Sequence, residues 1–267
     1  MRVAIVQLCS TDDVPSNLAA AGEGIDRAAA QGAEFVALPE AFAFLRREGA
    51  EIPEPGVLAE RAGSFLAERA RELGLWLLGG SVPEVIPGNT RIYNTSRLYD
   101  PTGAVVGEYR KIHLFDVDLD DSERGRYRES DRYAAGDAVV VVDGPSGGIG
   151  LSICYDVRFP ELYRKQVDAG ARWLCVPSAF TRETGKDHWE VLLRARAIES
   201  QCYVVAPAQC GWHSPDRASH GRSLIIDPWG LVVAQAGDQP TVLVADCPPS
   251  EIDRVRGAVP SLRNRRL

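Results

Sequence analysis

Short runs of apolar residues alternate along the chain with longer stretches whose apolar residues recur at helical spacing, which is typical of alternating strands and helices. The first apolar run spans 2–8, and the stretch 16–31 after it predicts an amphipathic helix that ends at Gly32. One face of this helix gathers Leu18, Ala21, Ile25 and Ala28. Further helices are predicted over 60–73 and 160–169, the latter with a proline in its first turn.

The order of elements in the first half of the chain returns in the second half. Gly32–Phe42 and Gly170–Phe180 both read Gly-Ala, then apolar residues, then Pro-x-Ala-Phe, and a proline just past a strand ends its hydrogen-bonding ladder. The neighbouring strands align as well, 2–8 with 148–154 and 74–82 with 201–209. Each half therefore predicts the order β-α-β-α-β followed by a β-hairpin.

Two turns predict the hairpins, Asp100-Pro-Thr-Gly103 in the first half and Asp227-Pro-Trp-Gly230 in the second. Aspartate at the first position, proline at the second and glycine at the fourth are typical of a type I turn. In the second half, Asp187-His-Trp-Glu190 predicts the N-terminal cap of a helix that runs through Gln201. One face of that helix is expected to gather Val191, Ala195, Ile198 and Cys202.

Two equivalent halves cover both faces of their sheets when they pack sheet against sheet with their helices outside. The predicted fold class is therefore α/β, a four-layer α-β-β-α sandwich with two mixed sheets and an internal pseudo-two-fold repeat. A length of 267 residues provides ample material for a core, and we expect residues 1–267 to form one domain.

Composition narrows the classes of function. The chain has 30 basic and 37 acidic residues with no sustained basic stripe, so a nucleic-acid partner is not expected. No apolar run approaches the length that spans a membrane. Six scattered cysteines without a Cys-x-x-Cys pair indicate reduced thiols and a cytoplasmic protein. The cysteines and four histidines show no ligand spacing, so no metal site is expected.

Cys154 is the candidate nucleophile because it ends a strand-like run and precedes a turn into a helix. Such a thiol lies at the carboxyl edge of a sheet, where open α/β proteins bind ligands, beside free backbone N–H groups. The alternative is that Cys154 is a small buried residue, which is the commoner state of a cysteine. Cys175 and Cys202 lie inside apolar runs and are predicted to belong to the core.

A nucleophilic thiol needs a base or a cation nearby. A histidine is the first possibility: His113 and His188 lie in suitable loops, whereas His213 and His220 fall in a polar stretch that is expected to be exposed. The other possibility is a carboxylate with a lysine. Apolar neighbours of Glu40 would raise its pKa, and Lys111 follows a hairpin strand just before the turn-prone segment 116–121. Taken alone, Glu40 and Lys111 could each also be an ordinary charged residue on the surface.

Three motifs together resemble the nitrilase (carbon–nitrogen hydrolase) superfamily. They are Leu38-Pro-Glu-Ala-Phe42, Tyr109-Arg-Lys-Ile-His-Leu-Phe115 and Ser152-Ile-Cys-Tyr-Asp-Val-Arg-Phe-Pro-Glu-Leu162, and they occur in the order of the family. The resemblance covers essentially the whole chain and implies the α-β-β-α sandwich that the repeat predicts. It also implies a Glu40–Lys111–Cys154 triad, a homodimer, and catalysis with no metal or organic cofactor.

The resemblance implies a role for each site residue. Glu40 accepts the thiol proton while Cys154 attacks an amide carbonyl, and Lys111 with the backbone N–H of Tyr155 holds the oxyanion. Glu40 then protonates the leaving ammonia and activates the water that hydrolyses the thioester. A further glutamate of the family matches Glu129, which orients Lys111 or the substrate.

Within the superfamily, the resemblance is closest to the branch of deaminated glutathione amidase and ω-amidase. It implies a small-molecule amide substrate that carries carboxylates, and Tyr155, Thr181 and Arg182 are the candidates to line its pocket, with Arg158 as a structural ion-pair residue. Gly185-Lys-Asp-His188 departs from the Gly-Pro-Ala-His expected in this branch, so the exact amide stays open. An N-carbamoyl amide hydrolase or another carbon–nitrogen hydrolase is the alternative, and a non-catalytic interaction protein on the same fold comes third.

Overall fold

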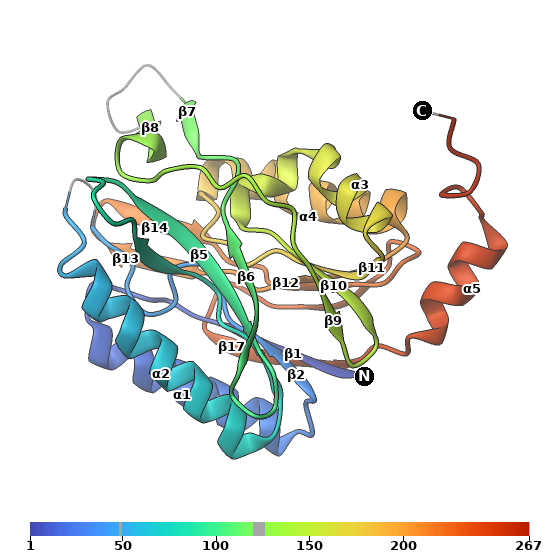
Figure 1. Cartoon of the computed structure of the whole chain (residues 1–267), viewed down its shortest axis with the longest axis horizontal. Coiled ribbons are helices and arrows are strands. Elements are labelled where there is room, and N and C mark those ends of the chain that lie inside the picture. The colour runs from blue at the N-terminus through green and yellow to red at the C-terminus, as the bar shows by residue number, and fades with distance from the viewer. Residues whose placement is uncertain (48–49, 120–125, 267) are drawn as a thin grey trace.

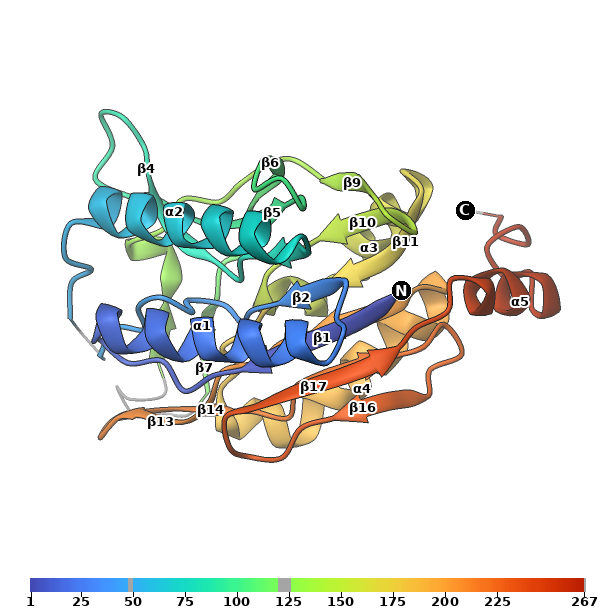
Figure 2. The same ribbon diagram turned by 90° about the horizontal axis from the view of Figure 1, so that it is seen from below.

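The computed structural model describes residues 1–47, 50–119 and 126–266. Two mixed β-sheets pack against each other, with one pair of helices on each outer side (Figures 1 and 2). The helices are α1 (Val14–Ala30), α2 (Pro55–Leu73), α3 (Pro160–Asp168), α4 (Arg182–Ser200) and α5 (Ser250–Ala258). Helices α1 and α2 cover the first sheet and α3 and α4 the second, whereas α5 lies beyond the end of the sandwich (Figure 1).

The strand order repeats between the two sheets. The first sheet has the order β17-β1-β2-β3-β5-β4, with β6 also paired to β5, and the second has the order β16-β15-β12-β11-β10-β9. The first sheet is built from β1 (Arg2–Gln7), β2 (Phe35–Ala37), β3 (Trp76–Leu78), β4 (Val82–Val85), β5 (Ile92–Tyr99), β6 (Val105–Arg110) and β17 (Thr241–Asp246). The second is built from β9 (Val141–Gly144), β10 (Gly147–Leu151), β11 (Ala171–Cys175), β12 (Tyr203–Ala206), β15 (Leu224–Ile226) and β16 (Val232–Gln235).

Each sheet contains three parallel strands followed by an antiparallel hairpin. These are β1, β2 and β3 with β5–β6 in the first sheet, and β10, β11 and β12 with β15–β16 in the second. The predicted repeat, the two mixed sheets and the α-β-β-α layers are therefore confirmed. Two small antiparallel pairs lie outside the sheets: β7 (Asp116–Asp118) with β8 (Arg126–Arg128), and β13 (Cys210–Ser214) with β14 (Arg217–His220). The predicted turn at 116–121 thus begins with a strand, and its residues 120–121 lie outside the described residues.

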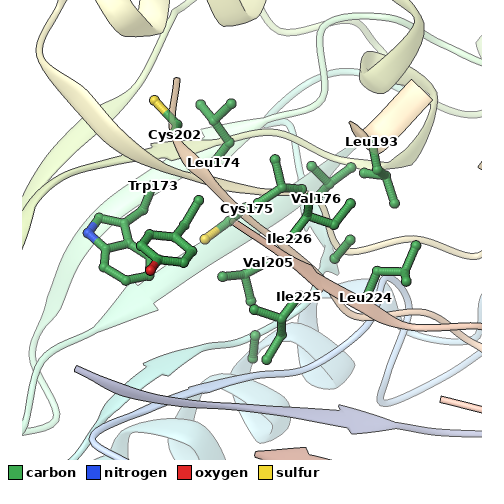
Figure 3. Packing of buried hydrophobic residues seen from close by; sticks show 14 of the residues in the cluster. Trp173, Leu174, Cys175, Val176, Leu193, Cys202, Val205, Leu224, Ile225 and Ile226 are labelled. Carbon is green, nitrogen blue, oxygen red and sulfur yellow. The ribbon is translucent and has the colours of Figure 1, made fainter. Parts of the chain in front are cut away.

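Apolar residues from both sheets form one cluster, and a second cluster joins the first sheet to helices α1 and α2. Ile5 and Ala37 from the first sheet and Trp173 and Val205 from the second are each at most 1 % exposed and belong to the same cluster. Figure 3 shows the side chains of this cluster around β11, β12 and β15. Cys175 and Cys202 are among them, as the sequence predicts. The core holds the two sheets in a fixed relation, so loops at their strand ends can meet with defined geometry.

The structure corrects the predicted start and face of helix α4. The helix begins at Arg182, not near Asp187, and its buried face contains Trp189, Leu193 and Ala197. Val191 and Ile198, which the sequence analysis assigned to the buried face, are 67 % and 50 % exposed. Trp189, the largest side chain of the helix, sets this rotation because its ring packs on Phe180 and its Nε1 donates to the carbonyl of Arg222 at 2.8 Å.

Candidate active site

Three loops at the ends of strands bring Glu40, Lys111 and Cys154 to one cavity. Glu40 follows β2 and Lys111 follows β6, both in the first sheet, whereas Cys154 follows β10 in the second. The cavity therefore lies where the carboxyl ends of strands from both halves meet, as the repeat suggests for Glu40 and Cys154.

Glu40 is a buried carboxylate held by three donors. Its Oε1 accepts from Asn94 Nδ2 at 2.9 Å and from Lys111 Nζ at 3.2 Å, and its Oε2 accepts from the backbone N–H of Ala179 at 2.8 Å. The neighbouring loop packs closely: a Cβ on Gly80 would lie 2.0 Å from the carbonyl oxygen of Pro39, and Gly80 has a positive φ of 54°. A side chain at position 80 would therefore displace the peptide that carries Glu40.

Lys111 lies between two carboxylates and is 2 % exposed. Its Nζ is 3.0 and 2.9 Å from the two carboxylate oxygens of Glu129, in addition to its contact with Glu40. Glu129 begins a short 3₁₀ helix, η2 (Glu129–Asp131), and its Oε2 also accepts from the backbone N–H of Phe115 at 2.6 Å. Burial alone would lower the pKa of Lys111, but the charges of Glu129 and Glu40 raise it well above its usual value. The ammonium is therefore a fixed positive charge.

Cys154 stands at the start of a 3₁₀ helix, η3 (Cys154–Arg158), three residues after β10 ends at Leu151. The expectation that Cys154 itself ends the strand is corrected, but a strand, a sharp turn and helical backbone do follow in that order. The turn is strained, because Cys154 has a positive φ of 50°. Its backbone N–H donates to the carbonyl of Pro177 at 3.0 Å, which anchors the turn to the loop after β11.

The resting site pairs a carboxylate with a protonated thiol. Burial would raise the pKa of Glu40, as the sequence suggests, but the charge of Lys111 and hydrogen bonds from Cys154 and the N–H of Ala179 outweigh it and lower that pKa. Burial and the charge of Glu40 raise the pKa of Cys154, and Lys111 opposes this only in part. Glu40 is therefore ionised and positioned to accept the thiol proton once a substrate stabilises the products of that transfer.

Asp156 ties the lysine segment to the cysteine turn and was not identified from the sequence. The carboxylate is fully buried. It accepts from Tyr109 Oη at 2.7 Å, from the backbone N–H of Ile153 at 2.8 Å, and from the backbone N–H of His113 at 3.0 Å, with His113 Nδ1 2.7 Å away. Because Tyr109 and His113 flank Lys111, this one carboxylate fixes the position of Lys111 relative to Cys154.

Replacing Asp156 with alanine is expected to destabilise the protein by about 3 kcal/mol or more, because several buried donors lose their acceptor at once. Urea unfolding followed by circular dichroism measures this change. The variant Asp143→Ala is the comparison, since Asp143 is exposed and its replacement should change the free energy of unfolding by less than about 0.5 kcal/mol. Equal stability of the two variants would contradict the organising role of Asp156.

No histidine is among the described residues that line the cavity, and His113, His188 and His213 make defined contacts elsewhere. His113 stacks on Phe159 with ring centroids 3.7 Å apart and contacts Asp156. His188 Nδ1 lies 3.2 Å from Arg158 Nη1. His213, predicted to be exposed, is only 6 % exposed, and its ring nitrogens contact the carbonyl of Ser10 and the hydroxyl of Ser219. Burial lowers the pKa of His213 to about 4, so it is neutral at physiological pH.

The cavity lining includes some of the pocket residues that the sequence analysis selected and excludes one. Tyr155 and Thr181 line the cavity. Arg182 does not; it is exposed on the first turn of α4, with its guanidinium 5.5 Å from the centre of the Trp212 ring. Arg158 makes no ion pair with a described residue but lies over the rings of Tyr155 and Phe180. The cationic side chains that do line the cavity are Lys111, Arg46, Arg132 and Arg217.

The structure adds three site residues that the sequence analysis does not identify. Asn94 lies inside strand β5 and looks like an ordinary polar strand residue, yet it donates to Glu40. Asp156 stands in the cysteine motif itself, and its place two residues after Cys154 is the signal that could have found it. Arg217 belongs to a polar hairpin whose position over the cavity depends on the tertiary fold.

The described residues lack the features of two other kinds of site. No group of three or more histidine, cysteine, aspartate or glutamate side chains is arranged there to hold a metal ion. Helices in the same part of the chain are all too short or too polar to cross a membrane.

Comparisons with known proteins agree with this geometry. The model of the carbon-nitrogen hydrolase family matches residues 2–257. Deaminated glutathione amidase from Synechocystis sp. is 45 % identical over 98 % of this chain and 97 % of its own length. The crystal structure of the Caenorhabditis elegans NitFhit protein superimposes with a TM-score of 0.92 at 41 % identity and covers 99 % of this chain, which spans 65 % of that protein.

A third relative has a reactive cysteine in its active site. An amidase from Nesterenkonia sp. is 27 % identical, with a TM-score of 0.79 over 99 % of each chain, and a mutant of it carries acrylamide added at the active-site cysteine. The matched family model spans nearly the whole chain, and the relatives agree with it in both sequence and fold. The chain therefore belongs to the carbon-nitrogen hydrolase family.

Proposed function

We propose that this protein is an amidase that hydrolyses a small carboxylate-bearing amide through a thioester on Cys154. The observation that carries the proposal is the meeting of Cys154, the ionised Glu40 and the buried ammonium of Lys111 at one cavity, with Lys111 Nζ 3.2 Å from Glu40 Oε1. A nucleophile, a base and a fixed cation in this relation are the parts that acyl transfer requires.

The first step forms the acyl-enzyme. The thiol proton passes to Glu40 while the Cys154 sulfur attacks the amide carbonyl carbon. Negative charge then develops on the carbonyl oxygen, where Lys111 and the backbone N–H of Tyr155, the second residue of η3, would hold it. Donors that are fixed in advance around such an oxyanion contribute about 3–4 kcal/mol each in acyl-transfer enzymes. Glu129 positions Lys111 through its two contacts to Nζ.

The second step releases the amine and regenerates the thiol. Glu40 returns the proton to the amide nitrogen as the carbon–nitrogen bond breaks. It then takes a proton from the water that attacks the thioester and gives that proton to the Cys154 sulfur as the carbon–sulfur bond breaks, which releases the carboxylic acid. The leaving group depends on the substrate. A primary ω-amide releases ammonia, as the sequence analysis expects, whereas the amide of deaminated glutathione joins the acyl group to the nitrogen of cysteinylglycine and releases that dipeptide.

Deaminated glutathione or a related 2-oxo acid amide is the substrate class that we propose. Its support comes from the name of the Synechocystis relative and from the three arginines that line the cavity. Arginine is suited to carboxylates because its planar guanidinium can donate two parallel hydrogen bonds. The homodimer and the cytoplasmic location that the sequence indicates stay predictions.

Hydrolysis of a panel of substrates by the purified protein tests this function. The panel comprises deaminated glutathione, 2-oxoglutaramate, an N-carbamoyl amine and a nitrile, with release of the carboxylic acid, ammonia or amine as the readout. We expect kcat/KM to be highest for one of the two 2-oxo acid amides. A clear preference for the N-carbamoyl amine or the nitrile would reassign the reaction within the family, and inactivity across the panel would favour the non-catalytic alternative.

A further inference from the structure

The β13–β14 hairpin extends from the second half of the fold to the first half beside the active-site cavity. On the side of the second half, Ser219 pairs with Thr181, and the backbone N–H of His220 donates to the carbonyl of Phe180 at 2.9 Å. On the side of the first half, His213 Nδ1 lies 2.8 Å from the carbonyl of Ser10. The hairpin is thus attached to both halves, which gives its side chains defined positions.

Arg217, the first residue of β14, reaches from this hairpin into the cavity lining. Its Nη1 donates to the backbone carbonyl of Arg46 at 3.0 Å, so the two arginines from different halves are neighbours. Both side chains are half-buried and both line the cavity. A hydrogen bond to a carbonyl holds the guanidinium in place but leaves its charge uncompensated.

The charge of Arg217 distinguishes it from other cations of the cavity. Lys111 lies between Glu40 and Glu129, and Arg132 forms an ion pair with Glu51 at 2.7 Å. Within residues 1–47, 50–119 and 126–266, no carboxylate lies within 4.0 Å of the Arg217 guanidinium. A half-buried cation without a carboxylate partner favours an anion from outside the protein.

Tyr133 connects this arginine pair to the catalytic residues. Its side chain lines the same cavity. Burial and the charge of Glu129 raise the pKa of Tyr133 to about 12, whereas the charges of Arg46 and Arg217 act in the opposite direction. The hydroxyl therefore stays protonated as a hydrogen-bond donor. Cys154, Tyr133 and the arginine pair line one cavity, which is thus continuous from the nucleophile to Arg46 and Arg217.

We propose that Arg217 determines the specificity of the enzyme by binding a carboxylate of the substrate, with Arg46 beside it. This inference rests on the proposed amidase function and assigns its selectivity to one side chain. The group recognised is a carboxylate at a distance from the scissile amide. Such a carboxylate can belong to the acyl part of the substrate or to the leaving amine. In each case the arginine would favour a different set of amides.

Three small amides separate these sources. Succinamate carries its carboxylate on the acyl part, N-butanoylglycine carries it on the leaving amine, and butanamide carries none. For the wild-type protein, we expect succinamate or N-butanoylglycine to have the higher kcat/KM relative to butanamide, and the preferred one identifies the side that Arg217 serves.

The variant Arg217→Gln is expected to lower kcat/KM for the preferred carboxylate substrate by about 10- to 100-fold, the usual effect of losing a hydrogen bond to a charged group. The loss should fall mainly on KM, while the values for butanamide stay within about 2-fold of wild type, because a remote carboxylate contact contributes binding in ground and transition state alike. For the preferred carboxylate substrate, the kcat/KM of Arg217→Lys is expected to lie between the values of the wild type and of Arg217→Gln, since lysine keeps the charge but not the planar fork. The unchanged rate with butanamide shows that the variant is folded.

A second variant and a binding measurement separate this inference from the proposed function. Arg182→Gln tests the alternative that the exposed arginine of α4 is the carboxylate partner. A lower kcat/KM for the carboxylate substrate in Arg182→Gln, with no decrease in Arg217→Gln, would overturn the inference. Equal loss with all three amides would also overturn it, because that result indicates a general defect. Calorimetric titration of succinamate and of N-butanoylglycine into Cys154→Ala protein, with and without Arg217→Gln, keeps the inference testable if no amide of the panel is hydrolysed. Binding of either carboxylate that is at least 10-fold weaker in the double variant supports the role of Arg217, and unchanged binding of both contradicts it.

Discussion

Replacing Cys154 with alanine is expected to lower kcat by about 10⁴-fold or more, since removal of a catalytic nucleophile has effects of this size in acyl-transfer enzymes. Alanine leaves no atom that can form the thioester, while Glu40 and Lys111 keep their contacts to each other. The melting temperature should stay close to that of the wild type, because the change removes one small side chain. Steady-state hydrolysis of the best amide of the panel measures the loss.

The matched control for this prediction is Cys9→Ala. Cys9 is a half-buried thiol outside the cavity lining, so its removal is expected to leave kcat and KM within about 2-fold of wild type. If Cys9→Ala and Cys154→Ala lost activity equally, or if Cys154→Ala stayed active, the mechanism proposed here would be wrong.

Replacing Lys111 with methionine is expected to lower both activity and stability. In the proposed mechanism Lys111 is an oxyanion donor, and loss of such a donor alone reduces kcat by about 10²- to 10³-fold. The variant also leaves the carboxylates of Glu40 and Glu129 without the cation between them, and breaking a buried ion pair from one side destabilises a protein by about 3–5 kcal/mol. Kinetic assay and urea unfolding of the same preparation measure the two effects.

The pH dependence of stability should change sign in Lys111→Met. In the wild type the pKa of Glu40 is lower in the folded state than its ordinary 4.5, so its contribution is present above that value and is lost as the pH falls through the folded pKa. Without Lys111, burial raises the pKa of Glu40 in the folded state. Its contribution is then present at low pH and is lost as the pH rises through the raised pKa. The variant should therefore be more stable at pH 5 than at pH 8.

The double variant Lys111→Met with Glu129→Gln tests this electrostatic explanation. Neutralising Glu129 removes one of the two carboxylates that the single variant leaves uncompensated, so part of the lost stability should return while the activity stays low. If the stability loss of the double variant equals the sum of the losses in Lys111→Met and Glu129→Gln, Lys111 acts through packing alone.

The fold could be predicted from the sequence because its signals are local and occur twice. The Gly-Ala to Pro-x-Ala-Phe segments mark equivalent strands, and Asp227-Pro-Trp-Gly230 marks a hairpin turn that the structure contains between β15 and β16. The face of α4 could not be predicted in the same way. Val191 and Ile198 have the right spacing for a core face, but Trp189 and its neighbours pack inward and leave them exposed.

The site was only partly predictable for a similar reason. The motifs of the family point to Glu40, Lys111 and Cys154, and the structure places all three at one cavity. The lowered pKa of Glu40 could not be inferred from its apolar neighbours in sequence, because the charge that outweighs burial comes from Lys111, 71 residues away. Arg182 is a pocket candidate in the sequence because a carboxylate substrate needs a cationic partner, but it lies outside the cavity lining, whereas Arg217 lines the cavity because a distant hairpin extends to it.

The measurement that tests the central claim most directly is the mass of the protein while it turns over substrate. Wild-type protein is mixed with the best amide of the panel, quenched in acid within the steady state and analysed by intact-protein and peptide mass spectrometry, with Cys154→Ala in parallel. A fraction of the wild-type protein should gain the mass of the acyl group, located on the peptide that contains Cys154, and Cys154→Ala should gain none. An acyl group found on another residue, or found equally in both proteins, would contradict the assignment of Cys154 as the nucleophile.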